Sequence, residues 1–340
     1  MTPLIHLMLI LAAWALCQAL PRKMYIPVLT VMGALAIGIF APVALIFILV
    51  SSLEAALLVR LLVRLDRGSG LRKWGLYALL PNLLFVDFNA LLLGMPVATL
   101  AISFSLIRIF MTARQILTSR KGFDRSELVW IFAAAFYLPA IVIGPVFAGQ
   151  DLRKQHRAAD WPAPTLRDAR MVLQGLVLSI VVSAWFFRYA DVLLPPLTAV
   201  FLFLSLFAAF WGQSLIAEHS SRFFGIHLPV NFDHPWKARS IKDFWQRWHR
   251  SMAQFVLQYI YLPLNLRGLN PRLATVAAFA FMGVWHNVSA GYLVWGICHG
   301  LLLVYAPEPD DRRLRNLIIR VGTWIAVISL SWFANYGPWS

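Results

Sequence analysis

Two of the eight histidines lie in apolar stretches near the C-terminus, and an ionisable residue at membrane depth is a functional candidate by default. His286 occurs in Gly-Val-Trp-His-Asn, and His299 occurs in Trp-Gly-Ile-Cys-His-Gly. An imidazole titrates near neutral pH and can take the proton of an attacking hydroxyl, which is the step that acyl transfer to an alcohol requires. A neutral histidine hydrogen-bonded to a neighbouring helix explains a lone ring about as well, so both interpretations stay open at this point.

A third candidate, His249, lies at the end of the most polar stretch of the chain, residues 218–250. A charged side chain at the centre of a membrane helix costs about 2.5–3.5 kcal/mol, so this stretch is expected at the interface or along a wet cavity, as the entrance to a site. Its basic residues could attract the phosphates of coenzyme A or of a phosphopantetheine arm. The usual excess of basic residues in a cytoplasmic loop would explain these side chains nearly as well. The basic residues are Lys237, Arg239, Lys242, Arg247 and Arg250.

The elements that position these residues must be membrane helices. The 340 residues are 60% hydrophobic and 13% charged, with a mean hydropathy of +0.70, whereas soluble domains carry about 25% charged residues. About 20 apolar residues cross a bilayer core of roughly 30 Å, and the apolar stretches here reach that length. The net charge of +15 fits basic cytoplasmic loops better than nucleic-acid binding, because no basic region is interleaved with exposed aromatic residues.

The basic residues of the first half alternate from loop to loop. They follow the first, third and fifth predicted helices, whereas the turns near Ala41 and Met95 contain no Lys or Arg. This pattern predicts an N-terminus outside and three cytoplasmic loops. The alternation fails beyond residue 126, which predicts that some later segments are re-entrant or interfacial. The basic residues that alternate are Arg22, Lys23, Arg60, Arg64, Arg67, Arg72, Lys73, Arg114, Arg120, Lys121 and Arg125.

The hydropathy pattern predicts an all-α integral membrane protein, a polytopic bundle of about 10–12 embedded helices in one domain, residues 1–340. The first stretch is interpreted as a retained helix rather than a signal peptide, because no basic region precedes it. Within the helices, Arg108 is expected to pair with Glu54 or Asp87 rather than contact substrate. The predicted helices are 4–20, 24–40, 42–63, 74–93, 96–113, 127–147, 171–188, 193–217, 252–264, 272–286, 288–305 and 316–334.

Several motifs occur in a fixed order along the C-terminal half. Residues 240–251 read Ser-Ile-Lys-Asp-Phe-Trp-Gln-Arg-Trp-His-Arg-Ser and residues 259–264 read Tyr-Ile-Tyr-Leu-Pro-Leu, and the Trp-His and Trp-Gly-Ile-Cys-His-Gly motifs follow. In this order they resemble the membrane-bound O-acyltransferase family, closest to its bacterial branch, which includes the alginate O-acetyltransferase membrane subunit and the teichoic acid D-alanyl transfer protein. The likeness extends upstream through Ile102–Phe104, Ile143–Val146, Phe210–Gly225, Asn231–Phe232 and Pro235.

The resemblance implies roles for particular residues. The invariant catalytic histidine of the family falls on His286, and a second important histidine falls on His249. These two are separated by 37 positions (286 − 249), so only folding can bring them together. We expect His286 to act as the base and His249 to orient a substrate, assisted by the Trp248 and Trp285 indoles, although the two histidines could exchange roles. The other expected substrate-binding residues are Asn231, Arg247, Tyr259, Tyr261, Asn287 and His299.

Four residues, in three motifs, depart from the family pattern. Asn287 replaces the glycine that usually follows the catalytic histidine, and Leu257-Gln258 replaces an Arg-Asp pair. Leu215 replaces an acidic residue. These departures concern the specificity for the acceptor or for a partner.

The resemblance predicts transfer of an acyl group, acetyl being favoured, from a cytoplasmic thioester to a hydroxyl of a cell-envelope glycan, its precursor or a relay partner. The co-substrate would be acyl-CoA or an acyl-carrier thioester, with no metal and no permanently bound cofactor. The expected partners are the lipid bilayer, the acyl donor and a periplasmic or extracellular relay protein, with no nucleic acid, and the expected location is a bacterial inner membrane. D-alanyl transfer from a carrier protein is an alternative, as is a non-catalytic transporter or scaffold.

Overall fold

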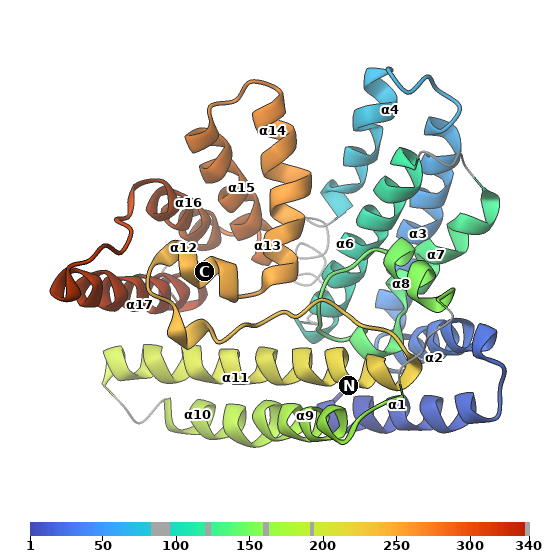
Figure 1. The fold of residues 1–340 in the computed structure, drawn as a ribbon, viewed down its shortest axis with the longest axis horizontal. Helices are drawn as coiled ribbons and strands as arrows, with labels where there is room; N and C mark the ends of the chain where they lie inside the picture. The colour runs from blue at the N-terminus through green and yellow to red at the C-terminus, as the bar shows by residue number, and fades with distance from the viewer. Residues whose placement is uncertain (83–95, 120–123, 159–162, 191–193, 337–340) are drawn as a thin grey trace. The chain divides into compact units, whose positions relative to one another are not determined.

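The computed structural model describes residues 1–82, 96–119, 124–158, 163–190 and 194–336. Regular structure in these ranges consists of helices, with no strand, so the predicted all-α class is confirmed (Figure 1). The helices form two compact units. We call residues 1–176 and 212–229 unit 1, and residues 177–211 and 230–340 unit 2. That the two units make one domain stays a prediction.

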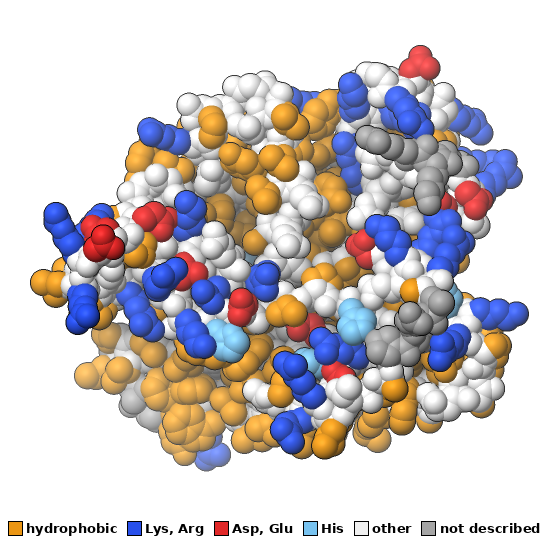
Figure 2. All heavy atoms as spheres, viewed as in Figure 1, with side chains coloured by type: hydrophobic (Ala, Val, Ile, Leu, Met, Phe, Trp, Pro, Cys, Tyr) orange, Lys and Arg blue, Asp and Glu red, His pale blue; other side chains and the backbone are white. Residues whose placement is uncertain are grey.

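Within the described residues, five helical stretches are long and apolar enough to cross a membrane. Many of their exposed residues are hydrophobic, and Figure 2 shows hydrophobic side chains exposed over much of the face in view. Ile39, for example, is 74% exposed, which is unfavourable in water but not in lipid. The five stretches are Arg22–Phe40, Pro42–Leu62, Leu166–Ala190, Pro196–Phe224 and Arg313–Tyr336.

Unit 1 begins with helices whose first turns contain proline. Pro3 and Pro42 stand at the first helical positions of their helices, where the missing N–H has no intrahelical partner to lose. The helices of unit 1 are α1 Pro3–Gln18, α2 Tyr25–Phe40, α3 Pro42–Leu62, α4 Gly70–Trp74, α6 Pro96–Thr118, α7 Val129–Ala135, α8 Gly149–His156, most of α9 Leu166–Val177 and the end of α11 Pro195–Ser221.

Unit 2 contains the later helices and all three candidate histidines. A π-helical turn, Leu178–Val182, joins α9 to α10, and a second one, Leu257–Tyr261, joins α13 to α14. Such turns often mark functional sites. The helices are α10 Ser183–Ala190, the first part of α11, α12 Ile241–Arg247, α13 Arg250–Val256, α14 Leu262–Leu266, α15 Pro271–His286, α16 Ala290–Tyr305 and α17 Arg313–Tyr336.

The prediction of one long helix over residues 127–147 is wrong. Helix α7 ends at Ala135, a short 3₁₀ turn spans Leu138–Ala140, and the chain is irregular up to α8. Pro139 and Pro145 explain the break, because proline lacks an N–H donor and restricts the residue before it. Most of the predicted helix 74–93 lies outside the described residues.

The helices α15 and α16 form a tightly packed hairpin. A Cβ added to Gly283 would lie 2.1 Å from the backbone oxygen of Tyr292, and one added to Gly296 would lie 2.3 Å from that of Phe279. Gly296 and Gly300 form a Gly-x-x-x-Gly pattern, which lets two membrane helices approach backbone to backbone. The close approach fixes the ends of both helices, and His286 is the last residue of α15.

Candidate active site

The backbone at His249 is held in a rarely used conformation. His249 precedes α13 with φ at 43°, in the left-handed region, which costs a non-glycine residue about 1–2 kcal/mol. Asn231 braces this corner, because its carbonyl oxygen accepts the Arg250 N–H (2.9 Å) and its Oδ1 accepts the Ser251 hydroxyl (2.8 Å). The His249 side chain is buried, with 3% exposed. The corner therefore places an imidazole inside unit 2 at a cost in backbone strain.

Helix α12, which leads to this corner, is anchored by Asp243. The Asp243 N–H donates to the Ser240 hydroxyl (3.2 Å), which caps the helix. Its carboxylate accepts bonds from Arg247 Nε (2.7 Å) and from the Arg239 backbone N–H (3.0 Å). Burial alone would raise the pKa of Asp243, but the hydrogen bond from Arg247 and the one from the Arg239 backbone outweigh it, so this pKa lies below its ordinary value.

Replacing Asp243 by Asn should destabilise unit 2 by about 1.5–3 kcal/mol at pH 7, the range for hydrogen bonds to a charged group. Because the pKa of Asp243 is lowered on folding, its contribution is present above its unfolded pKa and is lost as pH falls through the lower folded value. The thermal midpoint of the wild type should therefore exceed that of Asp243→Asn by a constant amount from pH 7 to pH 5. The difference should shrink only at more acid pH. An advantage that is independent of pH would contradict this.

His286 lies at the turn of the α15–α16 hairpin. Asn287 ends α15 in an extended conformation, and its N–H donates to the Gly283 carbonyl (3.3 Å). Ser289 caps α16, because its hydroxyl accepts the Tyr292 N–H (3.3 Å). Unlike His249, His286 is exposed in the structure.

Aromatic contacts join the three candidate histidines into one group. Trp285 contacts both His249 (6.4 Å between ring centroids) and His286 (4.7 Å). Trp295 contacts both His286 (5.4 Å) and His299 (4.5 Å). We call these five residues the histidine cluster. Because it is assembled from the corner before α13 and from both helices of the hairpin, the cluster exists only in the folded unit 2.

The buried histidine rings of the cluster lie in surroundings that disfavour the charged form of imidazole. The Phe210 ring lies edge to face on His249, with 4.7 Å between centroids. Burial lowers the pKa of His249 well below its ordinary value, and His286 lowers it further, so His249 is neutral at pH 7. His299 is 1% exposed, and its Nδ1 lies 3.0 Å from the Trp295 carbonyl oxygen.

Tyr292 supports His286 from the other helix of the hairpin. The two rings are nearly parallel, with 5.7 Å between centroids and 30° between planes. The Tyr292 hydroxyl donates to Asn335 Oδ1 in α17 (2.7 Å). Tyr292 thus ties the exposed His286 to a third helix.

The structure brings together some of the residues expected from the sequence and separates others. His249, Trp285, His286 and His299 meet in the cluster, whereas Trp248 stacks on Phe203 and Phe244 in a second aromatic group. Roles in substrate binding stay predictions for all of them. Of the remaining expected residues, Arg247 bonds Asp243 and the Asp233 carbonyl, Asn231 braces the corner, Tyr259 packs on Phe255, Tyr261 is half-buried and Asn287 is exposed.

Sequence reasoning missed one member of the histidine cluster, Trp295, and two of its neighbours, Trp245 and Tyr292, as site residues. Trp295 and His299 are four apart on a helix, a spacing that places two side chains on one face, so this contact could have been inferred. Trp245 contacts His299 and Trp295, with centroids 5.4 Å and 5.9 Å away. No local spacing joins Trp245 to α16, so that contact required the tertiary structure.

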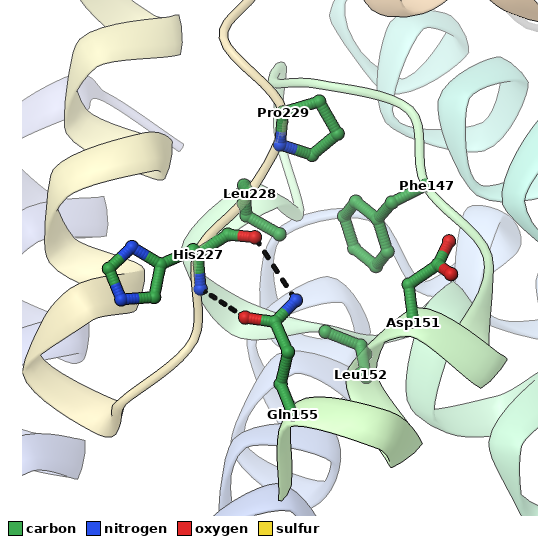
Figure 3. Close-up of a pocket in the computed structure, with 7 residues that line it drawn as sticks. All are labelled: Phe147, Asp151, Leu152, Gln155, His227, Leu228 and Pro229. Carbon is green, nitrogen blue, oxygen red and sulfur yellow. Dashed lines mark hydrogen bonds between the residues drawn. The ribbon is translucent and has the colours of Figure 1, made fainter. Parts of the chain in front are cut away.

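The polar stretch 218–250 is divided between the two units, and His219 and His227 belong to unit 1. There, His219 Nδ1 donates to Asp168 (2.8 Å), which also accepts a bond from Arg222 (3.0 Å). Gln155 binds both backbone groups of His227, at 2.6 Å and 3.1 Å, beside a pocket of about 330 Å³ (Figure 3). The pocket is lined by Phe147, Asp151, Leu152, Gln155, His227, Leu228 and Pro229, and the His227 ring points away from Phe147.

Arg108 in α6 of unit 1 is fully buried. Its guanidinium lies over the Phe147 ring, 4.8 Å from the centroid, and its Nη2 donates to the Pro145 carbonyl (3.3 Å). Within the described residues Glu54 accepts a bond from Asn82 (2.8 Å) rather than from Arg108, and Asp87 lies outside them. The same ranges contain no group of three or more His, Cys, Asp or Glu side chains that could hold a metal ion.

These features define a helical membrane protein with several candidate spans and a cluster of three histidines interleaved with tryptophans. The chain belongs to the membrane-bound O-acyltransferase family, whose model matches residues 79–308 and so covers more than half of it. The matched range includes every residue of the histidine cluster.

Three similar proteins act on envelope polymers according to their names. The peptidoglycan O-acetyltransferase of Helicobacter pylori is 24% identical over 58% of this chain and 41% of its own length. The teichoic acid D-alanyltransferase of Streptococcus thermophilus is 32% identical over 33% of this chain and 29% of its own. The "Probable alginate O-acetylase AlgI" of Pseudomonas syringae pv. tomato is 27% identical over 51% of this chain and 35% of its own length. The chain thus matches less than half the length of each.

Proposed function

We propose that this chain transfers an acyl group, namely acetyl, from a cytoplasmic thioester to a hydroxyl of a cell-envelope glycan, its precursor or a relay partner. The observation that carries the proposal is the histidine cluster, in which Trp285 and Trp295 join the exposed His286 to two buried imidazoles. Family membership and the printed activities of the similar proteins support the reaction class.

In the proposed reaction His286 takes the proton of the acceptor hydroxyl. The alcohol oxygen then forms a bond to the thioester carbonyl carbon, the bond from that carbon to sulfur breaks, and the thiolate leaves and takes up the proton. General base catalysis of this kind typically contributes about 10²- to 10⁴-fold. Tyr292, which stacks on the His286 ring, would help to hold that ring in place.

His249 would orient one of the substrates rather than carry charge. It is neutral at pH 7, so it can donate one hydrogen bond and accept another without introducing a second positive charge beside His286. Trp285, whose ring contacts both histidines, would pack against the bound substrates.

The proposed location is a bacterial inner membrane with the N-terminus outside. The bacterial sources of the similar proteins and the basic residues after the first, third and fifth predicted helices support it. The thioester donor would approach from the basic, cytoplasmic side. A periplasmic relay protein is a proposed partner for acceptors on the opposite side.

The test is transfer by the purified chain reconstituted in lipid vesicles. Radiolabelled acetyl-CoA is supplied with peptidoglycan fragments, alginate or lipoteichoic acid, and the label in the polymer is counted for wild type and for His286→Ala. Label in a polymer with wild type and its loss in His286→Ala is the expected result. His227→Ala is a matched control, because His227 is also exposed but lies in unit 1.

The identity of the acyl donor is tested in a separate experiment, because one similar protein is named a D-alanyltransferase. A D-alanyl thioester on a small acidic carrier protein replaces acetyl-CoA in the same vesicles. Transfer from the carrier alone would replace the acetyl assignment by D-alanyl transfer. Absence of transfer from either donor, with the protein folded and inserted, would leave the chain as a non-catalytic transporter or scaffold.

A further inference from the structure

Beside the histidine cluster lies a buried hydrogen-bond donor that the proposed reaction does not use. Trp245, on α12, is 8% exposed, and its indole Nε1–H has no hydrogen-bond partner among the described residues. Its ring contacts His299 edge to face, with 5.4 Å between centroids and 86° between planes, and Phe279 packs on it at 5.0 Å. A buried tryptophan N–H usually finds an acceptor, because leaving it unmet is unfavourable.

His299 offers the complementary group. Its Nδ1 lies 3.0 Å from the Trp295 carbonyl oxygen, and a carbonyl can only accept. Nδ1 must therefore carry the hydrogen, and in the neutral ring Nε2 then carries the lone pair. Neighbouring rings thus present one donor, Trp245 Nε1–H, and one acceptor, His299 Nε2. A hydroxyl satisfies both at once, because it accepts through its oxygen and donates its hydrogen.

This pair lies one ring away from the proposed base. Trp295 contacts Trp245 (5.9 Å between centroids), His299 (4.5 Å) and His286 (5.4 Å). A hydroxyl held by Trp245 and His299 cannot be the one that is acylated, because that one gives its proton to His286. The acceptor must then carry two hydroxyls within a few ångströms of each other, as sugars and polyols do.

We propose that Trp245 and His299 form a binding subsite for a second hydroxyl of the acceptor, and that the site thereby selects a sugar or polyol over a simple alcohol. The assignment of this ligand as the acceptor rests on the proposed function. Trp245 donates to the hydroxyl oxygen, and the hydroxyl donates to His299 Nε2. Binding of the hydroxyl therefore gives one hydrogen-bond partner to the Trp245 donor and one to the His299 acceptor.

A binding experiment tests the subsite without turnover. The full chain is reconstituted in lipid nanodiscs with ¹⁵N-labelled tryptophan, and the Trp245 indole N–H signal is assigned from its loss in Trp245→Phe. Glycerol should shift this signal in a saturable way. The control probe is 1,2-dimethoxyethane, which can accept a hydrogen bond but cannot donate one to His299, and it should leave the signal unchanged. A signal that glycerol does not move would overturn the subsite.

A kinetic experiment separates the subsite from the catalytic proposal. Trp245→Phe should raise the KM for the polyol acceptor about 5- to 10-fold, the effect of losing one neutral hydrogen bond, and leave the KM for acetyl-CoA unchanged. Trp324→Phe, the same substitution in α17, is the matched control, because Trp324 contacts Phe203 and Phe244 rather than the histidines. Equal changes in both KM values would show a structural role and overturn the subsite.

The two proposals can fail separately. If the chain transfers no acyl group but glycerol shifts the Trp245 signal, the subsite stands and the proposed function falls. Transfer that depends on His286 would support the proposed function. If, in the same protein, glycerol does not shift the Trp245 signal and Trp245→Phe does not raise the KM for the acceptor, the function stands and the subsite falls.

Discussion

His249→Ala and His286→Ala should each lower acyl transfer by about 10²- to 10⁴-fold, and the double variant should be little worse than the more damaging single variant. The reason is that the two rings contact the same indole, Trp285, at 6.4 Å and 4.7 Å between centroids. Residues that serve one step as a unit lose most of their effect when either is removed, so their free-energy changes do not add.

The measurement is the initial rate of label transfer in vesicles for the four proteins of the double-mutant cycle. His249→Asn is the folding control, because asparagine tolerates the left-handed backbone at this position better than alanine does. If His249→Ala is inactive only because the corner unfolds, His249→Asn should keep activity. Fully additive losses would show that the two histidines act in separate steps.

Gly283→Ala and Gly296→Ala should each disrupt the α15–α16 hairpin and abolish transfer without touching a histidine. The new Cβ would lie 2.1 Å from the Tyr292 oxygen or 2.3 Å from the Phe279 oxygen, and a backbone oxygen cannot rotate away as a side chain can. Overpacking typically costs 1–3 kcal/mol and occasionally more, and here the two helices must separate to relieve it. The thermal midpoint in detergent should fall by several degrees, about what 1–3 kcal/mol produces.

Gly322→Ala in α17 is the matched control for the hairpin, because nothing lies within 4 Å of a Cβ added there. It should keep both the midpoint and the transfer rate. A Gly283→Ala protein with a wild-type midpoint would contradict the close backbone contact between α15 and α16. A lowered midpoint with unchanged transfer would show that the hairpin stabilises unit 2 without positioning His286.

Hydropathy was sufficient to predict most helices, because apolar length in a membrane protein directly reflects the thickness of the bilayer. The predicted 42–63 and 272–286 segments agree with α3 and α15 within a residue or two. The segment 127–147 is equally apolar but is broken, since Pro139 and Pro145 interrupt the helix and hydropathy does not register a missing N–H.

The candidate site was predicted only in part. Motif order pointed to His249 and His286, and both lie in the histidine cluster. Of the two tryptophans expected beside them, Trp285 lies in the cluster but Trp248 does not, because α12 ends at Arg247 and Trp248 leaves the helix with ψ at 129°. That change of backbone direction turns Trp248 toward Phe203 and Phe244, whereas Trp245, still in the helix, contacts His299.

The left-handed backbone of His249 matters for any attempt to increase the stability of this protein. Glycine or asparagine would relax the strain there, so a consensus or energy-guided redesign that rewards stability alone would remove the imidazole. Protein engineering commonly meets this trade-off where function retains an unfavourable conformation. Under the proposed function this trade-off would fall on His249, and position 249 should therefore be excluded from stabilising libraries.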